Sequence, residues 1–341
     1  MGNRMVVVTG GAGFIGSHLC QALLRKGDKV VSVDNLNGFY DPGLKRKNIA
    51  AVERTAADCK TNKCSFISET ADIRDVGRVD CIFNKYTPDL IVHLAACAGV
   101  RPSIEAPAEY YGVNVGGTLT LLEVMKKYGV RNLVFASSSS VYGNNKKTPF
   151  SESDIVDNPV SPYAASKKAG EELCHVYHSL YKFNVACLRF FTVYGPRQRP
   201  DLAINKFTRM IDGGAPLPFF GDGTTSRDYT YIDDIIKGVL GAMSWLKTDS
   251  DSGPDAAIAP ATAKYDIFNL GGSKPVTLAQ MVATIEKALG KSALLHKLPA
   301  QPGDVERTFA DITKAERILG YKPGVDFATG VSNFVNWFLN A

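Results

Sequence analysis

Residues 5–16 read Met-Val-Val-Val-Thr-Gly-Gly-Ala-Gly-Phe-Ile-Gly, a short apolar run that passes directly into a glycine-rich turn. The apolar run is typical of a parallel strand buried on both faces, and the apolar periodicity through Leu24 predicts a helix after the turn. The spacing Gly11-x-Gly13-x-x-Gly16 lets the backbone turn tightly and approach a pyrophosphate, whose charge the amides at the helix N-terminus receive. This stretch therefore predicts a dinucleotide-binding strand, turn and helix.

The choice of dinucleotide depends on Asp34, which ends a second apolar run at residues 29–33. It lies about twenty residues past the glycines, where a carboxylate accepts hydrogen bonds from ribose hydroxyls and repels a 2′-phosphate. The sequence therefore predicts NAD rather than NADP.

Strand and helix patterns alternate along the first half of the chain. Strands are predicted at residues 65–68, 90–94, 132–136 and 184–190, and helices at 107–128 and 162–181. Such alternation predicts an α/β fold with a doubly wound parallel (Rossmann) sheet and right-handed crossovers. After Phe191 the pattern loosens into glycine- and proline-rich turns, with a later helix at 278–289 and a polar stretch at 249–260 that is typical of a mobile surface loop.

These patterns suggest two unequal domains. We expect an NAD-binding Rossmann domain over residues 1–190, which receives returning strands from the C-terminal part, and a smaller domain mainly over residues 191–341.

Composition excludes several classes of protein. The chain has 341 residues, 45% of them apolar, and a formal net charge of +5. No stretch approaches roughly 18 uninterrupted apolar residues, and residues 1–4 are too short for a signal n-region, so we expect neither a membrane span nor secretion. The one tight basic run, Lys45-Arg46-Lys47, predicts a solvated face, because a nucleic-acid groove needs a broader basic stripe.

The cysteines and histidines give no sign of a metal site. Seven cysteines make an odd number without a Cys-x-x-Cys pair, which indicates neither a disulfide framework nor a zinc site and fits a reducing cytoplasm. His175 and His178 share a helical face, but no Glu or Cys stands at ligand spacing around them. We therefore expect no metal.

Tyr163 and Lys167 lie one helical turn apart in the predicted helix 162–181. Residues four apart share a face, so the Lys167 ammonium should favour the phenolate and bring the pKa of Tyr163 from about 10 toward neutrality. An isolated Tyr-x-x-x-Lys is more often a surface pair. Beside a dinucleotide fold it predicts a general base for hydride chemistry at a carbinol carbon.

A serine run, residues 137–140, follows the predicted strand 132–136. One interpretation is that these serines form a turn and have no other role. Because ligands bind beyond the carboxyl ends of parallel strands, Ser138 is instead a candidate to hydrogen-bond a reacting oxygen and to relay a proton.

Several motifs in this order resemble the extended short-chain dehydrogenases/reductases, specifically the nucleotide-sugar epimerases and dehydratases, over essentially the full length. They are residues 9–16, Asp34, Asp72-Ile73, residues 93–96, 137–143, 163–167, 188–196 and 221–234. The resemblance implies that NAD is held by Gly10, Gly13, Phe14, Ile15, Gly16, Asp34, Asn35, Asn37, Asp72, Ile73, Leu94, Ala95, Ala96, Tyr163 and Lys167. It also implies a C-terminal domain that binds a nucleotide sugar, and pairing into a homodimer through helices 107–128 and 162–181.

Residues 34–45 and 190–201 are similar to the corresponding segments of UDP-glucuronate 4-epimerases. Sugar 4,6-dehydratases carry an Asp-Glu pair where this chain has Ser139 and Ser140, so dehydration is not expected. UDP-glucuronate decarboxylases usually carry Glu at Ser140, and UDP-glucose 4-epimerases typically carry Asn at Thr192. The resemblance therefore implies C4 epimerisation of UDP-glucuronate to UDP-galacturonate. UDP-glucose epimerisation, decarboxylation, a catalytically silent NAD sensor and an interaction scaffold are the alternatives.

The resemblance further assigns the substrate residues, which are Arg101, Ser138, Ser139, Ser140, Thr192, Arg199, Arg227 and Asp304. Arg227 should meet the pyrophosphate and Asp304 the nucleotide ribose, while an ion pair of Arg227 with Asp228 or Asp233 is the alternative. The hydroxyls are expected to hold the sugar carboxylate, with Arg199 as a charged closing residue. For Ser139 and Thr192, turn stabilisation is the other interpretation.

Overall fold

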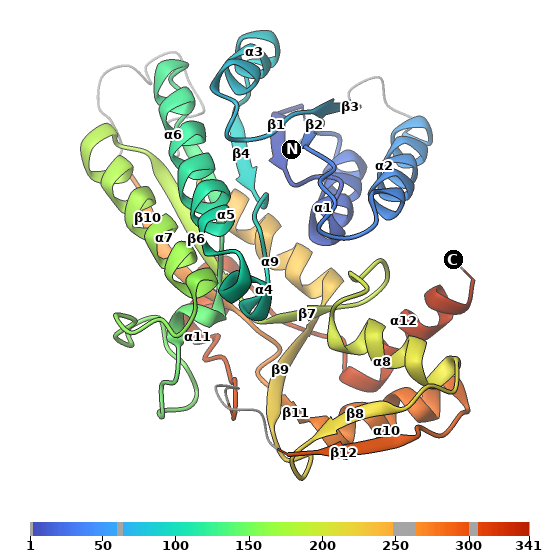
Figure 1. Cartoon of the computed structure of the whole chain (residues 1–341). Helices are drawn as coiled ribbons and strands as arrows, with labels where there is room; N and C mark the ends of the chain where they lie inside the picture. Colours follow the sequence, from blue (N-terminus) through green and yellow to red (C-terminus); the bar gives the residue numbers. More distant parts are fainter. Residues whose placement is uncertain (1–2, 60–63, 248–262, 300–305, 341) are drawn as a thin grey trace.

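The central element of the computed structural model is a parallel sheet of seven strands, in the order β10-β6-β5-β4-β1-β2-β3 (Figure 1). The model describes residues 3–59, 64–247, 263–299 and 306–340. The strands are β1 Met5–Thr9, β2 Lys29–Asp34, β3 Ser65–Thr70, β4 Leu90–His93, β5 Asn132–Ser138, β6 Asn184–Phe190 and β10 Tyr265–Leu270. The sheet grows from β1 in one direction through β2 and in the other through β4, so its switch point lies between β1 and β4, where open α/β sheets bind ligands.

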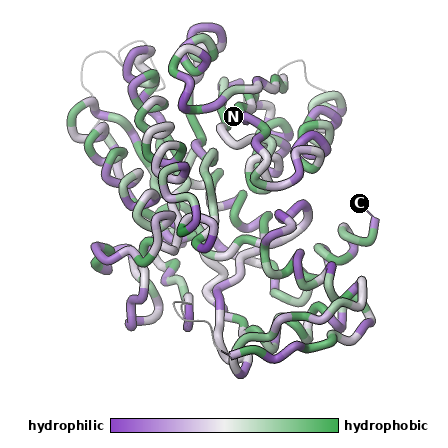
Figure 2. Tube along the Cα trace, in the orientation of Figure 1, coloured by the Kyte–Doolittle hydropathy of each residue, from purple (hydrophilic) through white to green (hydrophobic). Residues whose placement is uncertain are grey.

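Both faces of the sheet are buried. Successive side chains of a strand point to opposite faces, so Val6 and Val8 join one core cluster and Val7 joins the other. The first cluster includes residues of α1 Phe14–Arg25, α2 Pro42–Ala57, α9 Ile232–Trp245 and α11 Thr313–Leu319. The second includes residues of α3 Val76–Tyr86, α6 Thr118–Lys127 and α7 Pro162–Tyr181. Figure 2 shows apolar and polar residues interspersed along these helices, as expected for elements with one buried side.

The elements predicted at 162–181, 184–190 and 278–289 are confirmed as α7, β6 and α10 Leu278–Leu289. The strand predicted at 132–136 extends two residues further, so β5 ends at Ser138 itself.

Three consecutive helical segments, α5 Pro107–Tyr111, the π-helical η1 Gly112–Gly117 and α6, confirm the helix predicted at 107–128. The sequence did not predict that residues 112–117 are π-helical, nor that a separate short helix, α4 Val100–Glu105, precedes the long one. A π-helical turn carries an extra residue and shifts the phase of the helix. In this segment Asn114 turns toward the loop after β4, where its side chain exchanges hydrogen bonds with the N–H (2.8 Å) and the carbonyl (2.9 Å) of Cys97. Apolar periodicity does not report such a local contact.

The C-terminal part adds two small sheets beside the carboxyl ends of the central strands (Figure 1). One contains β7 Thr192–Tyr194, β9 Ser226–Tyr231 and β11 Pro275–Thr277, and the other β8 Leu217–Phe220 and β12 Leu295–Leu298. Helices α8 Ala203–Asp212, α10 and α12 Phe327–Leu339 accompany them, and the 3-10 turn η2 Ser139–Tyr142 follows β5. The chain returns to the central sheet at β10, whereas the domain division at residue 190 stays a prediction.

Two expectations about the surface are corrected. Cys59 and Cys64 form a disulfide, with their Cα atoms 6.7 Å apart. The indication against disulfide bonding is therefore wrong for this pair. Lys45 is buried rather than solvated, because its ammonium bonds to side chains of the preceding loop. The predicted loop 249–260 lies outside the described residues.

Two further observations concern the described parts of the chain. No helix there is long and apolar enough to cross a bilayer. No group of three or more His, Cys, Asp or Glu side chains is arranged there to hold a metal ion.

Candidate active site

A cavity of about 720 Å³ lies at the carboxyl ends of the central strands, between the sheet and the C-terminal part. Every predicted site residue that the structure describes lines it, from the glycines of the first turn to Ser138, Tyr163, Thr192 and Arg227. Asp304 lies outside the described residues. Folding therefore brings together side chains that are more than two hundred positions apart in the sequence.

The turn after β1 forms a close-fitting cradle at one end of the cavity. A Cβ on Gly16 would lie 2.1 Å from the carbonyl oxygen of Gly10. Gly10 itself has φ +71°, and a Cβ there would lie 2.8 Å from the amide nitrogen of Ala95. Helix α1 has Gly13 as its N-cap and no side-chain cap. This end of the helix faces the cavity and has the form that receives a pyrophosphate.

Asp34 ends β2 at the rim of the same cavity. Its Oδ1 accepts hydrogen bonds from the amide of Leu36 (2.9 Å) and from Nζ of Lys45 (3.4 Å). Lys45 also donates to Oδ1 of Asn37 at 2.9 Å. The loop after β2 therefore holds the Asp34 carboxylate where ribose hydroxyls would meet it. The buried Lys45 helps to fix that position, because it bonds both Asp34 and Asn37.

Asp72 follows β3 and closes the next part of the rim. Arg74 donates to it from Nε (3.0 Å) and Nη2 (2.8 Å), and Asn35 donates from Nδ2 (2.9 Å). The hydrogen bonds from Arg74 lower the pKa of Asp72 to about 2, so the carboxylate is ionised at neutral pH. Two predicted cofactor residues, Asn35 and Asp72, are thus in direct contact.

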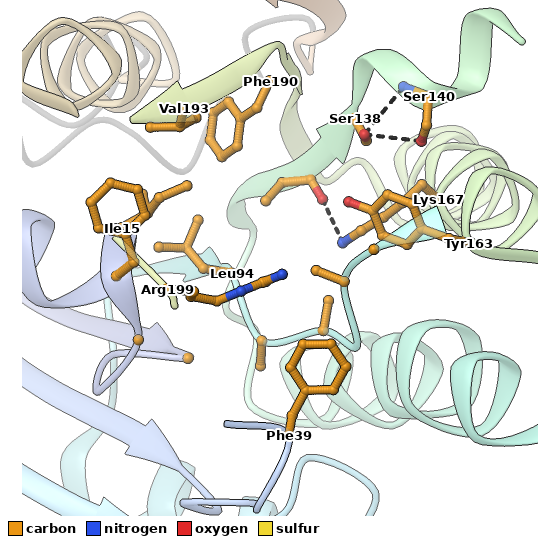
Figure 3. Close-up of a pocket in the computed structure, with 18 of the residues that line it drawn as sticks. Ile15, Phe39, Leu94, Ser138, Ser140, Tyr163, Lys167, Phe190, Val193 and Arg199 are labelled. Atoms are coloured by element: carbon orange, nitrogen blue, oxygen red, sulfur yellow. Dashed lines mark hydrogen bonds between the residues drawn. The ribbon is translucent and has the colours of Figure 1, made fainter. Parts of the chain in front are cut away.

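Ser138, Tyr163 and Lys167 meet on the opposite wall (Figure 3). Ser140 donates hydrogen bonds to Oγ of Ser138 from its hydroxyl (2.9 Å) and its amide (3.2 Å). The Ser138 hydroxyl also faces the Tyr163 phenol and, as a hydrogen-bonding neighbour, lowers the pKa of Tyr163. The serine run thus forms a turn and also brings the Ser138 hydroxyl to the phenol.

The expected effect of Lys167 on Tyr163 is not found in this structure. Burial raises the pKa of Tyr163, and the hydrogen bond of Ser138 and the charge of Arg199 only partly oppose it. Lys167 donates its Nζ hydrogen bond to the carbonyl of Ala136 at 2.8 Å, and burial lowers its own pKa to about 8. The prediction that Lys167 brings the pKa of Tyr163 toward neutrality is therefore wrong here, because the ammonium bonds the strand and burial disfavours the phenolate.

Arg199 reaches into the middle of the cavity (Figure 3). It forms a two-point ion pair with Asp201 (3.0 and 2.7 Å), and its guanidinium lies 5.2 Å from the centre of the Phe39 ring. Phe39 and Asp201 also line the cavity, although neither was predicted from the sequence. An acidic residue two positions after the arginine and an aromatic residue in the loop after Asp34 were the available signals.

The C-terminal part contributes Thr192, the first residue of β7, and Arg227 on β9. Arg227 donates from Nη1 to the carbonyl of Ser226 at 2.9 Å. The carboxylate of Asp228 is buried and accepts the amides of Gly272, Ser273 and Ala310. The alternative of an Arg227–Asp228 ion pair is therefore not what the structure shows.

Comparison with known proteins extends these observations. A family model described as GDP-mannose 4,6 dehydratase matches residues 7–334. UDP-glucuronate 4-epimerase 3 of Arabidopsis thaliana is 45% identical over an alignment of 340 residues that covers 98% of this chain and 76% of that protein.

Solved structures agree with the sequence relatives. A UDP-glucuronic acid 4-epimerase from Bacillus cereus, in complex with UDP-glucuronic acid and NAD, has a TM-score of 0.84 and 36% identity over 98% of this chain and 99% of its own. A Thermotoga maritima UDP-glucose 4-epimerase with UDP-glucose has a TM-score of 0.82 and 31% identity, over 98% of this chain and 99% of its own. The chain therefore belongs to the NAD-dependent epimerase/dehydratase family that the GDP-mannose 4,6 dehydratase model describes.

Proposed function

We propose that this chain is an NAD-dependent epimerase that converts UDP-glucuronate to UDP-galacturonate by inverting C4. The observation that carries the proposal is one cavity in which Tyr163, Ser138 and Lys167 lie beside a pyrophosphate cradle, with serines where dehydratases need an acid and a base. The Arabidopsis and Bacillus cereus proteins that resemble the chain over nearly all its length carry this activity in their names.

The residues present fit NAD. The cradle at Gly10 and Gly16 has no room for a Cβ, and Asp34 stands at the rim where it would accept the ribose hydroxyls and repel a 2′-phosphate. The chemistry that NAD supplies when bound is reversible acceptance of the hydride from the sugar C4, so a complete turnover leaves no net redox change.

Tyr163 acts as the general base that takes the proton of the sugar 4-hydroxyl. Because burial raises its pKa, the phenolate depends on the hydrogen bond of Ser138 and on the positive charge of Arg199. The Ser138 hydroxyl holds the reacting oxygen and relays the proton. The 4-keto sugar then rotates in the cavity and presents its opposite face. Tyr163 returns the proton to the new alcohol.

The 4-keto form of glucuronate is a β-keto acid, which loses carbon dioxide when its C5–C6 bond aligns with the carbonyl π system. Ser139, Ser140 and Thr192 line the cavity as neutral donors. They hold the carboxylate near the carbonyl plane and suppress decarboxylation through geometry. Arg199 closes the cavity over the sugar. Arg101 and Arg227 bind the negatively charged groups of the substrate.

UDP-glucose 4-epimerase is the second candidate, because the Thermotoga maritima enzyme of that name has nearly the same fold. Thr192, where such enzymes typically carry Asn, favours the glucuronate substrate. A UDP-glucuronate decarboxylase is the third, and Ser140 in place of Glu is the feature against it. A silent NAD sensor or a scaffold would have no need to keep Tyr163, Ser138 and Lys167 in contact with the cavity.

The proposal includes a homodimer, a cytoplasmic location and the two-domain division at residue 190. Support for the homodimer comes from exposed apolar side chains on the helices concerned, which are Tyr111, Leu119, Val176, Leu180 and Tyr181. The cytoplasmic location rests on the sequence pattern alone and stays a prediction.

The decisive experiment gives the purified protein UDP-glucuronate and, separately, UDP-glucose. Proton NMR and mass spectrometry of the products distinguish the candidates. UDP-galacturonate of unchanged mass supports the proposal, UDP-galactose supports the second candidate, and a UDP-pentose that has lost carbon dioxide supports the decarboxylase. Absence of turnover with both sugars would overturn the epimerase proposal.

A further inference from the structure

Glu171 lies one helical turn beyond Lys167 on α7, and its side chain is 1% exposed. Its Oε1 accepts hydrogen bonds from the hydroxyl of Ser137 (2.6 Å) and from Nε of Arg189 (2.9 Å), while its Oε2 accepts Nη2 of Arg189 (2.8 Å). Ser137 and Arg189 are paired neighbours on β5 and β6. We call Ser137, Glu171 and Arg189 the Glu171 clamp, because one carboxylate joins the helix to two adjacent strands.

The residues of the Glu171 clamp are direct neighbours of residues that line the cavity. Ser137 precedes Ser138, and Arg189 precedes Phe190, which also lines the cavity. Two consecutive residues of β5 are therefore held from α7, the carbonyl of Ala136 by Lys167 and the hydroxyl of Ser137 by Glu171. The next residue, Ser138, faces Tyr163 of the same helix.

Polar contacts continue on β10, the strand next to β6. Asn269 on β10 pairs with Arg189 in the sheet and accepts a hydrogen bond from the Tyr142 hydroxyl at 2.7 Å. The guanidinium of Arg189 lies 4.8 Å from the centre of the Tyr142 ring. These polar contacts thus extend across three adjacent strands, β5, β6 and β10, and reach the cavity at Ser137.

Stability alone does not account for this arrangement. A buried ion pair gains little over well-packed apolar residues of similar volume, because both charges are desolvated. Arg189 even keeps a buried Nη1 with no hydrogen-bond partner. What the ion pair supplies is directional: a two-point, charge-assisted contact fixes the distance and the angle between its partners.

We propose that Glu171 is a positioning residue, which sets the distance and angle between the Tyr163 phenol and the Ser138 hydroxyl through its contacts with Ser137 and Arg189. This inference rests on the proposed function, because it concerns the proton transfer of that reaction. Loosening the Glu171 clamp should misalign Ser138 and weaken its hydrogen bond to the phenol.

Side chains from several elements face Tyr163. They are Ser138 on β5, Lys167 on α7, Tyr110 on α5, Cys97 in the loop after β4, and Arg199 from the segment after β7. The hydrogen bond of Ser138 lowers the pKa of Tyr163. A weaker bond should therefore raise that pKa and move the acidic limb of the kcat profile to higher pH.

Ser137→Ala tests this with a mild change, because it removes one hydrogen bond and leaves the ion pair. We expect kcat for UDP-glucuronate to fall about tenfold, given that a misplacement of ~1 Å can reduce a rate roughly 100-fold, while KM stays unchanged. The matched control is Tyr265→Phe, which removes a hydrogen bond to the main-chain oxygen of Glu171 (3.3 Å) but not to its carboxylate. It should keep the wild-type kcat and pH profile.

The double variant Glu171→Leu with Arg189→Met removes both buried charges together, so urea unfolding should show stability close to that of the wild type. Its kcat should fall at least as far as that of Ser137→Ala. A stable protein with reduced kcat and a shifted acidic limb separates positioning from a purely structural role.

A readout independent of turnover is the pKa of Tyr163, followed by NMR of protein labelled at tyrosine Cζ and assigned with Tyr163→Phe. We expect a higher pKa in Ser137→Ala than in wild type and Tyr265→Phe. An unchanged pKa and an unchanged kcat in both clamp variants would overturn the positioning role. A wild-type protein that converts no UDP-sugar would overturn the proposed function, and the Tyr163 pKa would still decide the positioning role.

Discussion

Lys167 donates a hydrogen bond from Nζ to the main-chain oxygen of Ala136 at 2.8 Å. This contact joins the helix that carries Tyr163 to the strand that ends in Ser138. Burial also lowers the pKa of Lys167 to about 8, because desolvation disfavours the charged form. The packing that places Tyr163 therefore also determines the charge of its neighbour.

The lowered pKa predicts how stability depends on pH in the cofactor-free protein. Between pH 8 and 10.5 the unfolded chain keeps a proton on Lys167 that the folded chain has lost, so the free energy of unfolding rises with pH. Relative to Lys167→Met, the wild type should gain about 3 kcal/mol across this window. Urea unfolding of both proteins at a series of pH values measures the gain, and a constant difference would contradict it.

Tyr163→Phe should reduce epimerisation by roughly 10²- to 10⁴-fold, the usual contribution of a positioned acid–base group. NAD should stay bound, because only the phenolic oxygen is lost. Tyr110→Phe is the matched control, since the Tyr110 ring lies 6.2 Å from that of Tyr163 and its hydroxyl bonds the carbonyl of Ala98. Turnover assays and cofactor absorbance test both variants, and an unchanged kcat in Tyr163→Phe would remove Tyr163 from the mechanism.

Asp34→Ala should reduce the preference for NAD over NADP by roughly tenfold or more, the equivalent of one hydrogen bond to a charged group. The substitution also frees Lys45, which bonds Asp34 at 3.4 Å, to meet a 2′-phosphate. Asp41→Ala is the control, because Asp41 caps helix α2 through the amide of Gly43 and should affect stability alone. Equal discrimination by wild type and Asp34→Ala in dinucleotide titrations would show that the ribose assignment is wrong.

Leu180→Asp should convert the proposed homodimer to a monomer. Leu180 is 64% exposed and Val176 is 45% exposed on the same helix, and a charge there would be desolvated in a helix-to-helix interface. Leu295→Asp is the control, because Leu295 is also exposed but lies on β12 in the C-terminal part. Light scattering at micromolar concentration reports the mass, and a wild-type monomer would refute the dimer.

The sequence predicted those parts of the site that depend on backbone form and strand ends. The glycine turn, Asp34 and the Ser138–Tyr163–Lys167 group were recoverable, because a parallel sheet brings the carboxyl ends of its strands to one edge. The bounds of α7 and β6 were also recoverable, because helix and strand patterns alternate clearly in this part of the chain.

What escaped prediction depends on contacts between distant segments. The π-helical turn at Asn114, the burial of Lys45 and the stacking of Arg199 on Phe39 each involve a partner that periodicity does not reveal. The pKa of Tyr163 was predicted in the wrong direction for the same reason. The spacing of Tyr163 and Lys167 shows that they share a helix face, but not that Ala136 takes the ammonium.

The last prediction concerns Thr192, which lines the cavity at the start of β7 and is proposed to hold the substrate carboxylate rather than to move a proton. Thr192→Ala should let the C5–C6 bond align with the ketone more often. UDP-glucuronate would then yield a UDP-4-keto-pentose and carbon dioxide, with the C4 hydride left on the cofactor as NADH, beside UDP-galacturonate. Loss of one hydrogen bond to a charged group is worth roughly 1.5 to 3 kcal/mol, or about 10- to 150-fold in partitioning.

Two companion variants decide whether the hydroxyl itself is responsible. Thr192→Ser keeps the donor and should release no carbon dioxide, whereas Ser139→Ala removes a second proposed donor and should leak as Thr192→Ala does. Mass spectrometry of the products detects the loss of carbon dioxide directly. If Thr192→Ala and Ser139→Ala only slow the reaction, with no decarboxylated product, these hydroxyls do not protect the intermediate. Ser140 and Arg199, which also line the cavity, would then be the remaining candidates to hold the carboxylate.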